Sequence, residues 1–239
     1  MWITGKTKLL GVMGWPVEHS RSPQMQAAAA ESAGLNVAYV PLAVAPEKVG
    51  DAVRGLPALG FLGANVTVPH KQAVMEFLDE LSPAASGIGA VNTIIVDPDS
   101  GQLRGDNTDA DGAWEALREE IGVEAKDEGV AVIGAGGAAR AVAWGAGARG
   151  ARKVVILNRT VAKAEALAGE MARQHAGTEY IGAGLDDREA LAGVRIFMQM
   201  TSLGMKEGDP LPLDPEAMPA DAVGLEAVYA PLDTHWRMA

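Results

Sequence analysis

The sequence contains no cysteine and no long hydrophobic run. Without cysteine, disulfide frameworks, thiolate nucleophiles and Cys-based zinc sites are excluded, and we expect no metal site. No stretch approaches the roughly 18 consecutive apolar residues that a membrane helix needs, and the apolar run at residues 9–13 is too short for a signal peptide. The sequence therefore predicts a soluble protein in the cytoplasm, a reducing compartment that suits a chain without cysteine.

Basic and aromatic residues are both scarce. Lys and Arg number 20 against 31 Asp and Glu, which gives a formal net charge of −11 and a pI of about 4.8. This balance argues against non-specific binding to nucleic acid or to an anionic membrane surface. Aromatic residues make up only 5% of the chain, while 29 glycines and a hydrophobic fraction of 48% are typical of closely packed α/β layers. The 239 residues suffice for one large domain or two small ones.

Short apolar runs alternate with helix-like segments along the whole chain. The pattern predicts strands at residues 9–13, 38–42, 63–68, 91–96, 130–133, 153–157, 194–200 and 223–229. It predicts helices at residues 23–33, 46–54, 69–81, 110–121 and 161–175, and another after Gly134. Strands that alternate with helices indicate largely parallel sheets. A second such pattern begins after Asp109, so we expect two α/β domains, residues 1–108 and 109–239.

A glycine-rich turn follows the predicted strand at 130–133. It reads Gly134-Ala135-Gly136-Gly137-Ala138-Ala139-Arg140. In such a turn Gly134 allows the tight bend, Gly136 lets the backbone approach a pyrophosphate, and Ala139 permits close packing of helix and strand. Because a strand precedes it and a helix follows it, the turn predicts a dinucleotide site at the N-terminus of that helix, with Gly134, Ala135, Gly136, Gly137 and Ala138 at the cofactor.

The next predicted strand ends in Asn158-Arg159-Thr160. NAD-binding proteins usually place a carboxylate there for the ribose 2′-hydroxyl, whereas an arginine suits a 2′-phosphate. Lys163 lies one helical turn further on and adds positive charge. The alternative is that Arg159 and Lys163 form a solvated basic face of an acidic domain. The pattern favours NADP over NAD.

Three polar segments stand at strand ends in the first expected domain and at its junction with the second. In the first, Ser20 and Ser22 precede a helix that opens at Pro23; ordinary helix capping explains one of these serines, but two serines beside His19 less well. In the second, Thr67 ends a strand and Lys71 stands in the first turn of the predicted helix at 69–81. The helix dipole disfavours a cation there, which suits a group that exchanges protons.

His70 is the rival proton carrier to Lys71, but we predict it to be a surface or capping residue. In the third segment, Asn92 is placed to bind a hydroxyl group, and Asp109 to pair with Lys71 and orient it. Asp106 and Asp111 are explained as an acidic loop that caps the next helix.

Together these motifs resemble those of shikimate dehydrogenases. They are Gly-x-Pro-Val-x-His-Ser-x-Ser-Pro at 14–23, Asn-Val-Thr-Val-Pro-x-Lys at 65–71, Gly-Ala-Val-Asn-Thr at 89–93, Asn-Thr-Asp at 107–109, Gly-Ala-Gly-Gly-Ala-Ala-Arg at 134–140, Asn-Arg-Thr at 158–160 and Thr-Ser-Leu-Gly-Met at 201–205. Their order and spacing cover nearly the whole chain. The family reversibly reduces 3-dehydroshikimate to shikimate with NADPH, in the chorismate pathway to aromatic amino acids.

The resemblance implies a role for each domain and for individual residues. Residues 1–108 would form a substrate-binding α/β domain and residues 109–239 a Rossmann-like NADP-binding domain, with the active site in the cleft between them. Lys71 and Asp109 would form the catalytic pair. The substrate residues would be Ser20, Ser22, Thr67, Lys71, Asn92, Asp109 and Tyr229, and the cofactor residues would include Asn158, Arg159, Thr160, Lys163 and Thr201.

The chain departs from the family pattern at several places. Gln26-Ala27 stands where His-Asn is usual, Gln199-Met200-Thr201 where Asn-Ala-Thr or Asn-Thr-Thr is usual, and Ala230-Pro231 where Asn-Pro is common. The family's chains also continue into helices that return to the first domain and carry a substrate-contacting glutamine, whereas this chain ends at Ala239. We therefore expect an incomplete substrate site, weaker substrate affinity and an exposed apolar patch, with a homodimer as one hypothesis.

Two further functions are consistent with the same residues. A quinate/shikimate dehydrogenase differs in its substrate and often accepts NAD; Arg159 without a carboxylate at position 158 favours NADP and shikimate. A non-catalytic dinucleotide-binding homologue is the other alternative. The presence of both Lys71 and Asp109 argues against it, because a decayed site has no reason to keep the pair.

Overall fold

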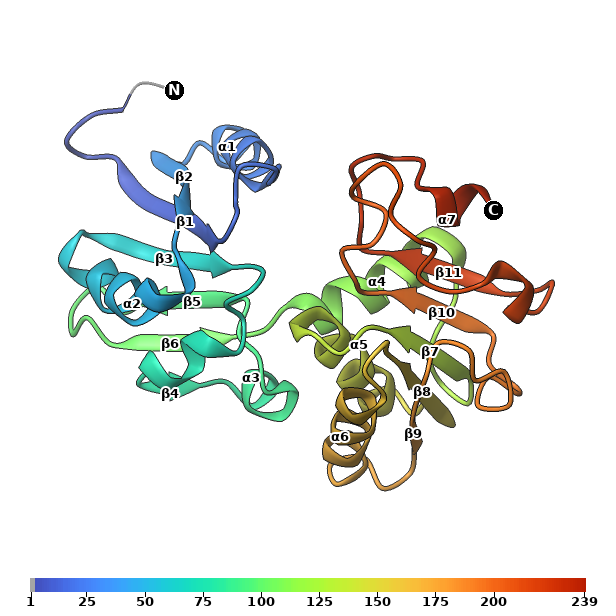
Figure 1. Ribbon diagram of the computed structural model, residues 1–239. Helices are drawn as coiled ribbons and strands as arrows, with labels where there is room; N and C mark the ends of the chain where they lie inside the picture. Colours follow the sequence, from blue (N-terminus) through green and yellow to red (C-terminus); the bar gives the residue numbers. More distant parts are fainter. Residues whose placement is uncertain (1–2) are drawn as a thin grey trace. The chain divides into compact units, whose positions relative to one another are not determined.

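The computed structural model describes residues 3–239, and the chain divides into two compact units at the junction of Thr108 and Asp109 (Figure 1). We call them the first unit and the second unit. Each unit has one sheet of its own. No helix within residues 3–239 is long and apolar enough to cross a membrane.

The sheet of the first unit has six strands in the order β2-β1-β3-β5-β6-β4. They are β1 Lys8–Gly14, β2 Val37–Ala43, β3 Phe61–Val66, β4 Glu80–Leu81, β5 Thr93–Val96 and β6 Leu103–Asp106. β1 pairs in parallel with β2 and β3, as the sequence predicts, whereas β5 is antiparallel to both β3 and β6. The antiparallel β5–β6 hairpin was not predicted, because β6 is only four residues long and includes a charged Arg104 and Asp106.

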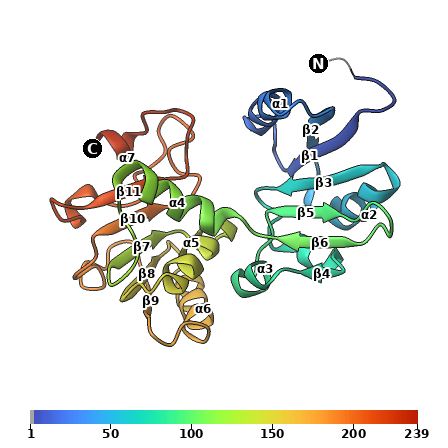
Figure 2. The ribbon, with the colours of Figure 1, turned by 180° about the vertical axis from the view of Figure 1, so that it is seen from behind.

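The helices of the first unit are α1 Ser22–Ser32, η1 Pro46–Lys48, α2 Val49–Ala58, η2 Ala73–Phe77 and α3 Pro83–Ile88. Val53 and Leu56 of α2 and Val74 of η2 form a buried core with Met13 and Ile94 from the sheet. α1 contacts β2 and β1, at one end of the sheet (Figure 2). α2 and η2 therefore pack against the sheet and stabilise its strands.

The predicted helix at residues 69–81 is wrong. Residues 71 and 72 form a turn, and only the short 3-10 helix η2 follows, before β4. The carbonyl oxygen of Lys71 accepts a hydrogen bond from Val91 N–H at 2.7 Å. This long-range bond takes the place of the bond that an α-helix would make, so Lys71 does not stand in a helical first turn and the dipole argument for it fails.

The second unit contains a five-stranded parallel sheet in the order β11-β10-β7-β8-β9. Its strands are β7 Gly129–Ile133, β8 Lys153–Leu157, β9 Glu179–Ala183, β10 Ile196–Gln199 and β11 Val223–Glu226. Its helices are α4 Asp109–Ile121, α5 Gly137–Ala148, α6 Val161–Ala172, η3 Pro215–Ala217 and α7 His235–Met238. β9 and α7 were not predicted.

Both faces of this second sheet are covered. Val130 and Val132 of β7 pack with α4, α5 and α6, whereas Ala131 and Ile133 pack with Phe197 and the loops on the opposite face. All residues of β7, β8 and β10 are buried, which is the pattern of a parallel sheet between two layers. Two α/β units, the second of them Rossmann-like, confirm the predicted fold class.

Close packing of α6 on β9 makes Gly182 intolerant of a side chain. A Cβ at this position would overlap the backbone of Ala164 and Glu165, whereas a Cβ at Gly184, just beyond the strand, would meet only Val161 Cγ2 at 3.5 Å. We expect Gly182→Ala to lower the free energy of unfolding by about 1–3 kcal/mol. Gly184→Ala is the matched control and should stay within about 0.5 kcal/mol of the unsubstituted protein. Urea denaturation measures both, and equal stabilities would contradict this account of the packing.

Candidate active site

Thr67 follows the carboxyl end of β3, directly beside the segment that follows β1. Thr67 N–H donates to Met13 O at 2.8 Å, and Trp15 N–H donates to Val68 O at 3.0 Å. A Cβ on Gly14 would lie 2.5 Å from Thr67 Cγ2, so a side chain at position 14 would force Thr67 to shift. The parallel register of β1 and β3 thus brings two of the predicted polar segments to one edge of the sheet.

Ser20 lies at the same edge, between β1 and α1, and Ser22 is the first residue of α1; both are half-buried. Ser20 Oγ accepts a hydrogen bond from Ser22 N–H at 3.2 Å. The N-cap position of α1 belongs to Arg21, whose side chain makes no capping bond. Helix capping by an N-cap serine therefore does not explain the pair, although Ser20 does stabilise the turn that leads into α1.

Asn92 is a buried anchor at the start of β5. Its side-chain oxygen accepts from Thr108 N–H at 3.0 Å and from the Thr93 hydroxyl at 2.8 Å, and its Nδ2 donates to Thr108 Oγ1 at 3.0 Å. Val66 N–H donates to Asn92 O at 2.7 Å, which places Asn92 beside the end of β3. Asn92 therefore links the end of β3, where Thr67 follows, to Thr108, the last residue of the first unit.

Lys71 is half-buried in the turn after β3, and the bond from Val91 N–H to its carbonyl oxygen holds this turn next to Asn92. His70 is not a surface or capping residue as predicted: it is 1% exposed. Its Nε2 lies 2.6 Å from Val44 O, so the ring serves as a buried link to the segment after β2.

The acidic residues near the junction differ in their roles. Asp109 is the half-buried first residue of α4, in the second unit, and Asp111 pairs with Arg149 at 2.7 Å. Asp106 does not cap α4 as predicted: it ends β6 and accepts a hydrogen bond from the Ser82 hydroxyl at 2.5 Å. Tyr229 follows β11 and is 56% exposed.

A polar link inside the first sheet was not predicted. Tyr39 on β2 donates its hydroxyl to Asn65 Oδ1 at 2.7 Å, and Asn65 Nδ2 donates to Thr93 Oγ1 and to Asn92 O. Burial raises the pKa of Tyr39 to about 12, so the hydroxyl remains a donor. A lone tyrosine in an apolar strand carried no signal of this, because its partner is 26 residues away.

The glycine-rich turn lies at the carboxyl end of β7 in the second unit. Gly134 has a φ of +117°, a conformation that favours glycine. Gly136 is the N-cap of α5 and supplies no side chain to cap its first turn, and a Cβ on Gly136 would meet no atom within 4 Å. No side chain caps the first backbone N–H groups of α5, and the space beside Gly136 is open, which fits an incoming phosphate.

The segment Asn158-Arg159-Thr160 follows β8, the strand next to β7. Asn158 Nδ2 donates to Thr160 O at 3.0 Å and shapes the turn into α6. Arg159 and Lys163 are both exposed, and neither forms an ion pair with any residue in the described range 3–239. An exposed guanidinium without a carboxylate partner in this range fits a phosphate ligand.

Thr201 follows β10, the neighbour of β7 on the other side. A Cβ on Gly134 would lie 3.1 Å from Thr201 Cγ2 and 3.2 Å from Met200 O, so the loop after β10 touches the glycine-rich turn. The predicted cofactor residues thus meet along one edge of the sheet, from β8 through β7 to β10. A dinucleotide binds across such an edge in doubly wound folds.

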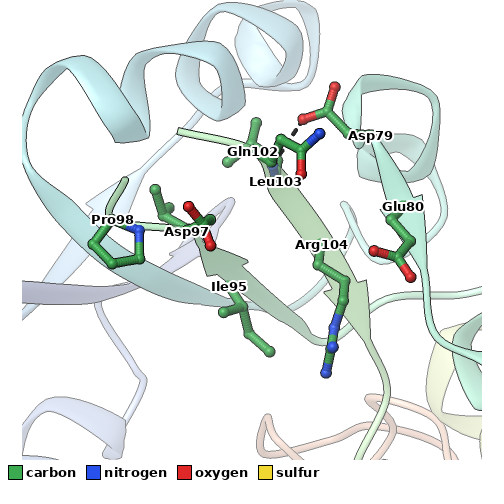
Figure 3. A pocket seen from close by; sticks show the side chains of 9 residues that line it. Asp79, Glu80, Ile95, Asp97, Pro98, Gln102, Leu103 and Arg104 are labelled. Carbon is green, nitrogen blue, oxygen red and sulfur yellow. Dashed lines mark hydrogen bonds between the residues drawn. The ribbon is translucent and has the colours of Figure 1, made fainter. Parts of the chain in front are cut away.

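Two hollows on the described residues lie away from these positions. One, of about 510 Å³, is lined by Asp79, Glu80, Asp97, Arg104 and neighbours on β4, β5 and β6 (Figure 3). Its carboxylates hold the local backbone: Asp79 accepts from Leu103 N–H, and hydrogen bonds from Ser100 lower the pKa of Asp97. The other, of about 560 Å³, is lined by residues 188, 191–195 and 217–219 together with Glu128 and Asp221. Neither contains a predicted site residue.

Two family models match the chain. Residues 12–94 match the shikimate dehydrogenase substrate binding domain, and residues 116–189 match the model described as shikimate / quinate 5-dehydrogenase. Among similar proteins are the shikimate dehydrogenases (NADP(+)) of Paramagnetospirillum magneticum and Methanocaldococcus jannaschii. They are 44% and 45% identical, cover 97% of this chain, and are themselves covered to 83% and 82%.

Solved structures with the same fold carry related ligands. A shikimate dehydrogenase in complex with NADP+ has a TM-score of 0.91 and 43% identity, with 99% of this chain and 82% of that one covered. A shikimate 5-dehydrogenase from Thermus thermophilus, in complex with NADP(H) and shikimate, has a TM-score of 0.84 and 35% identity, with 97% and 83% covered. A quinate dehydrogenase from Corynebacterium glutamicum in complex with NAD has a TM-score of 0.85 and 29% identity, with 97% and 84% covered.

Proposed function

Since this chain belongs to the shikimate dehydrogenase family, we propose that it is an NADP-dependent oxidoreductase that interconverts 3-dehydroshikimate and shikimate. The proposal rests on three features that lie together at the carboxyl edge of the second sheet. There an uncapped helix N-terminus, a glycine turn open to solvent and an arginine without an ion pair among the described residues lie along adjacent strands.

The residues of this edge fit NADP in particular. The uncapped N–H groups at the start of α5 suit the pyrophosphate, with Gly134, Ala135, Gly136, Gly137 and Ala138 as the cradle. Arg159, with Asn158, Thr160 and Lys163 beside it, suits a 2′-phosphate, because position 158 offers an amide where NAD-binding proteins place a carboxylate. Thr201, after β10, is the last residue that we assign to the cofactor.

For the reaction itself, we assign the proton transfer to Lys71. NADP, when bound, supplies or accepts the hydride. The Lys71 ammonium delivers a proton to the carbonyl oxygen of the substrate as this oxygen becomes a hydroxyl, and takes the proton back in the reverse direction. We assign Asp109 to the catalytic pair as the residue that orients Lys71.

The substrate is a small molecule with several hydroxyls and a carboxylate. We assign Ser20, Ser22 and Thr67 to it as hydrogen-bonding groups, since they lie along one edge of the first sheet. We assign Asn92 to the substrate as well, and its amide also holds Thr108 in place. We also assign Tyr229, which is exposed after β11, to the substrate. The homodimer and the cytoplasmic location stay predictions.

The proposed function is tested by the initial rate of nicotinamide reduction with shikimate and NADP+. We expect a rate that saturates in both substrates and that is much lower with quinate or with NAD+. A higher rate with quinate and NAD+ would instead establish a quinate dehydrogenase. Binding of NADP+ without turnover of either substrate would mean that the protein is a non-catalytic homologue.

Replacing Arg159 tests the assignment of the 2′-phosphate. We expect Arg159→Ala to raise the KM for NADP+ about 10- to 100-fold, because a charge-assisted hydrogen bond contributes about 1.5–3 kcal/mol, while the KM for NAD+ changes little. Arg173→Ala, at the other end of α6, is the control and should change neither value. Equal weakening of the two cofactors by Arg159→Ala would show that this arginine does not read the 2′-phosphate.

Replacing Lys71 tests the proton transfer. We expect Lys71→Ala to lower kcat about 100- to 10,000-fold, the usual contribution of a positioned acid–base group, with NADP+ affinity close to that of the unsubstituted protein. Lys48→Ala removes a lysine that pairs with Asp51 on the surface and should leave kcat unchanged. Full turnover in Lys71→Ala would exclude the mechanism.

A further inference from the structure

Gln199, the last residue of β10, is a completely buried polar side chain at the edge that we assign to the cofactor. It is 0% exposed. The backbone around it is fully engaged in the sheet: Met200 N–H donates to Ile133 O, and Ala227 N–H donates to Gln199 O, both at 2.9 Å. The side chain therefore starts from a fixed strand end, and its hydrogen-bond partners show which segments it holds in place.

All the hydrogen bonds of the Gln199 amide go to the loop after β10 and to one carboxylate. Its Oε1 accepts from Thr201 N–H at 2.5 Å, and its Nε2 donates to Leu203 O at 2.8 Å. Nε2 also donates to Glu226 Oε1 at 3.3 Å. Thr201 Oγ1 in turn accepts from Leu203 N–H at 3.1 Å. One amide thus sets the path of the loop that carries Thr201.

Glu226 connects this amide to the segment before α7. Its second oxygen, Oε2, accepts from the Thr234 hydroxyl at 2.6 Å, and Thr234 is 1% exposed. Thr234 also caps α7, since its Oγ1 accepts from Arg237 N–H at 3.2 Å. Gly204, in the same loop, fits between the two: a Cβ there would lie 3.3 Å from both Glu226 Oε1 and Thr234 Cγ2.

We propose that Gln199, Glu226 and Thr234, which we call the Gln199 network, are positioning residues that hold the loop 200–204 against the glycine-rich turn and so set the affinity for the nicotinamide half of NADP. The inference rests on the proposed function, because it needs the edge of the second sheet to be the cofactor site. The loop touches that turn through Thr201 and Met200 at Gly134.

The residue types agree with this role. An amide offers both an acceptor and two donors, so Gln199 satisfies Thr201 N–H, Leu203 O and the Glu226 carboxylate at once. A carboxylate at position 199 would have no donor for Leu203 O and would face Glu226. An apolar side chain of the same length would leave buried polar groups of the loop without partners, which is costly.

The position of the network on the sheet predicts which half of the cofactor it affects. β8, which carries Arg159, and β10, which carries Gln199, lie on opposite sides of β7. A change in the loop after β10 should therefore weaken a complete dinucleotide but leave a ligand that occupies only the β8 side unaffected. Adenosine 2′,5′-bisphosphate is such a ligand, because it lacks the nicotinamide half.

The experiment is calorimetric titration of the full-length protein and its variants with NADP+ and with adenosine 2′,5′-bisphosphate. We expect Thr234→Val to raise the Kd for NADP+ about fivefold and Gln199→Met about tenfold or more, the factors that correspond to the loss of one or two buried hydrogen bonds. The Kd for adenosine 2′,5′-bisphosphate should not change. Thr234→Ser keeps the hydroxyl and should restore the affinity for NADP+.

Thr178→Val is the matched control. Thr178 is also a buried threonine, 8% exposed, and its hydroxyl donates to Ala151 O at 2.7 Å, but it lies at the opposite edge of the sheet, before β9 begins. It should lower stability without changing either Kd. Thr234→Val keeps the inference testable if Gln199→Met fails to fold.

Two outcomes overturn the inference while leaving the proposed function intact. One is an unchanged Kd for NADP+ in the variants; the other is equal weakening of NADP+ and adenosine 2′,5′-bisphosphate, which would mean a general loss of structure. Failure of the unsubstituted protein to bind NADP+ would instead refute the proposed function, and the inference with it.

Discussion

The register of parallel strands is the constraint on which both candidate half-sites depend. In the first unit, β1 and β3 run in the same direction, so the segments after Gly14 and Val66 emerge at one edge and hydrogen-bond to each other. In the second unit, β7, β8 and β10 do the same for the glycine-rich turn, Arg159 and Thr201. Residues far apart in the chain meet there because carboxyl ends of parallel strands share an edge.

A buried amide shapes the loop at this edge in each unit. Asn92 satisfies Thr108 and Thr93, and Gln199 satisfies Thr201 and Leu203. An amide suits this task because it donates and accepts hydrogen bonds and carries no charge that must be desolvated. The proton transfer assigned to Lys71 and the cofactor contact assigned to Thr201 thus depend on neutral side chains that take no part in the chemistry.

Long-range contacts explain three of the differences from the predicted structure. The helix expected at 69–81 does not form, because the carbonyl of Lys71 is taken by Val91 N–H from another part of the chain. His70 is buried for a similar reason, through Val44 O. β6 was missed because four residues with alternating polarity carry little signal on their own, and pairing with β5 supplies its stability. In each case a long-range contact decides the local structure.

Local patterns by themselves predicted the α/β class and the order of elements in two units. They also predicted a dinucleotide site at the glycine-rich turn and a preference for NADP from the arginine after β8. Turn chemistry and hydrophobic periodicity are properties of neighbouring residues, so the sequence alone reveals them. Only the tertiary structure decided which side chains hold others in place: Asn92 on Thr108, Tyr39 on Asn65, and Gln199 with Glu226 and Thr234. These bonds join residues on different strands and loops, and the sheet register that brings them within reach follows from packing of the whole unit.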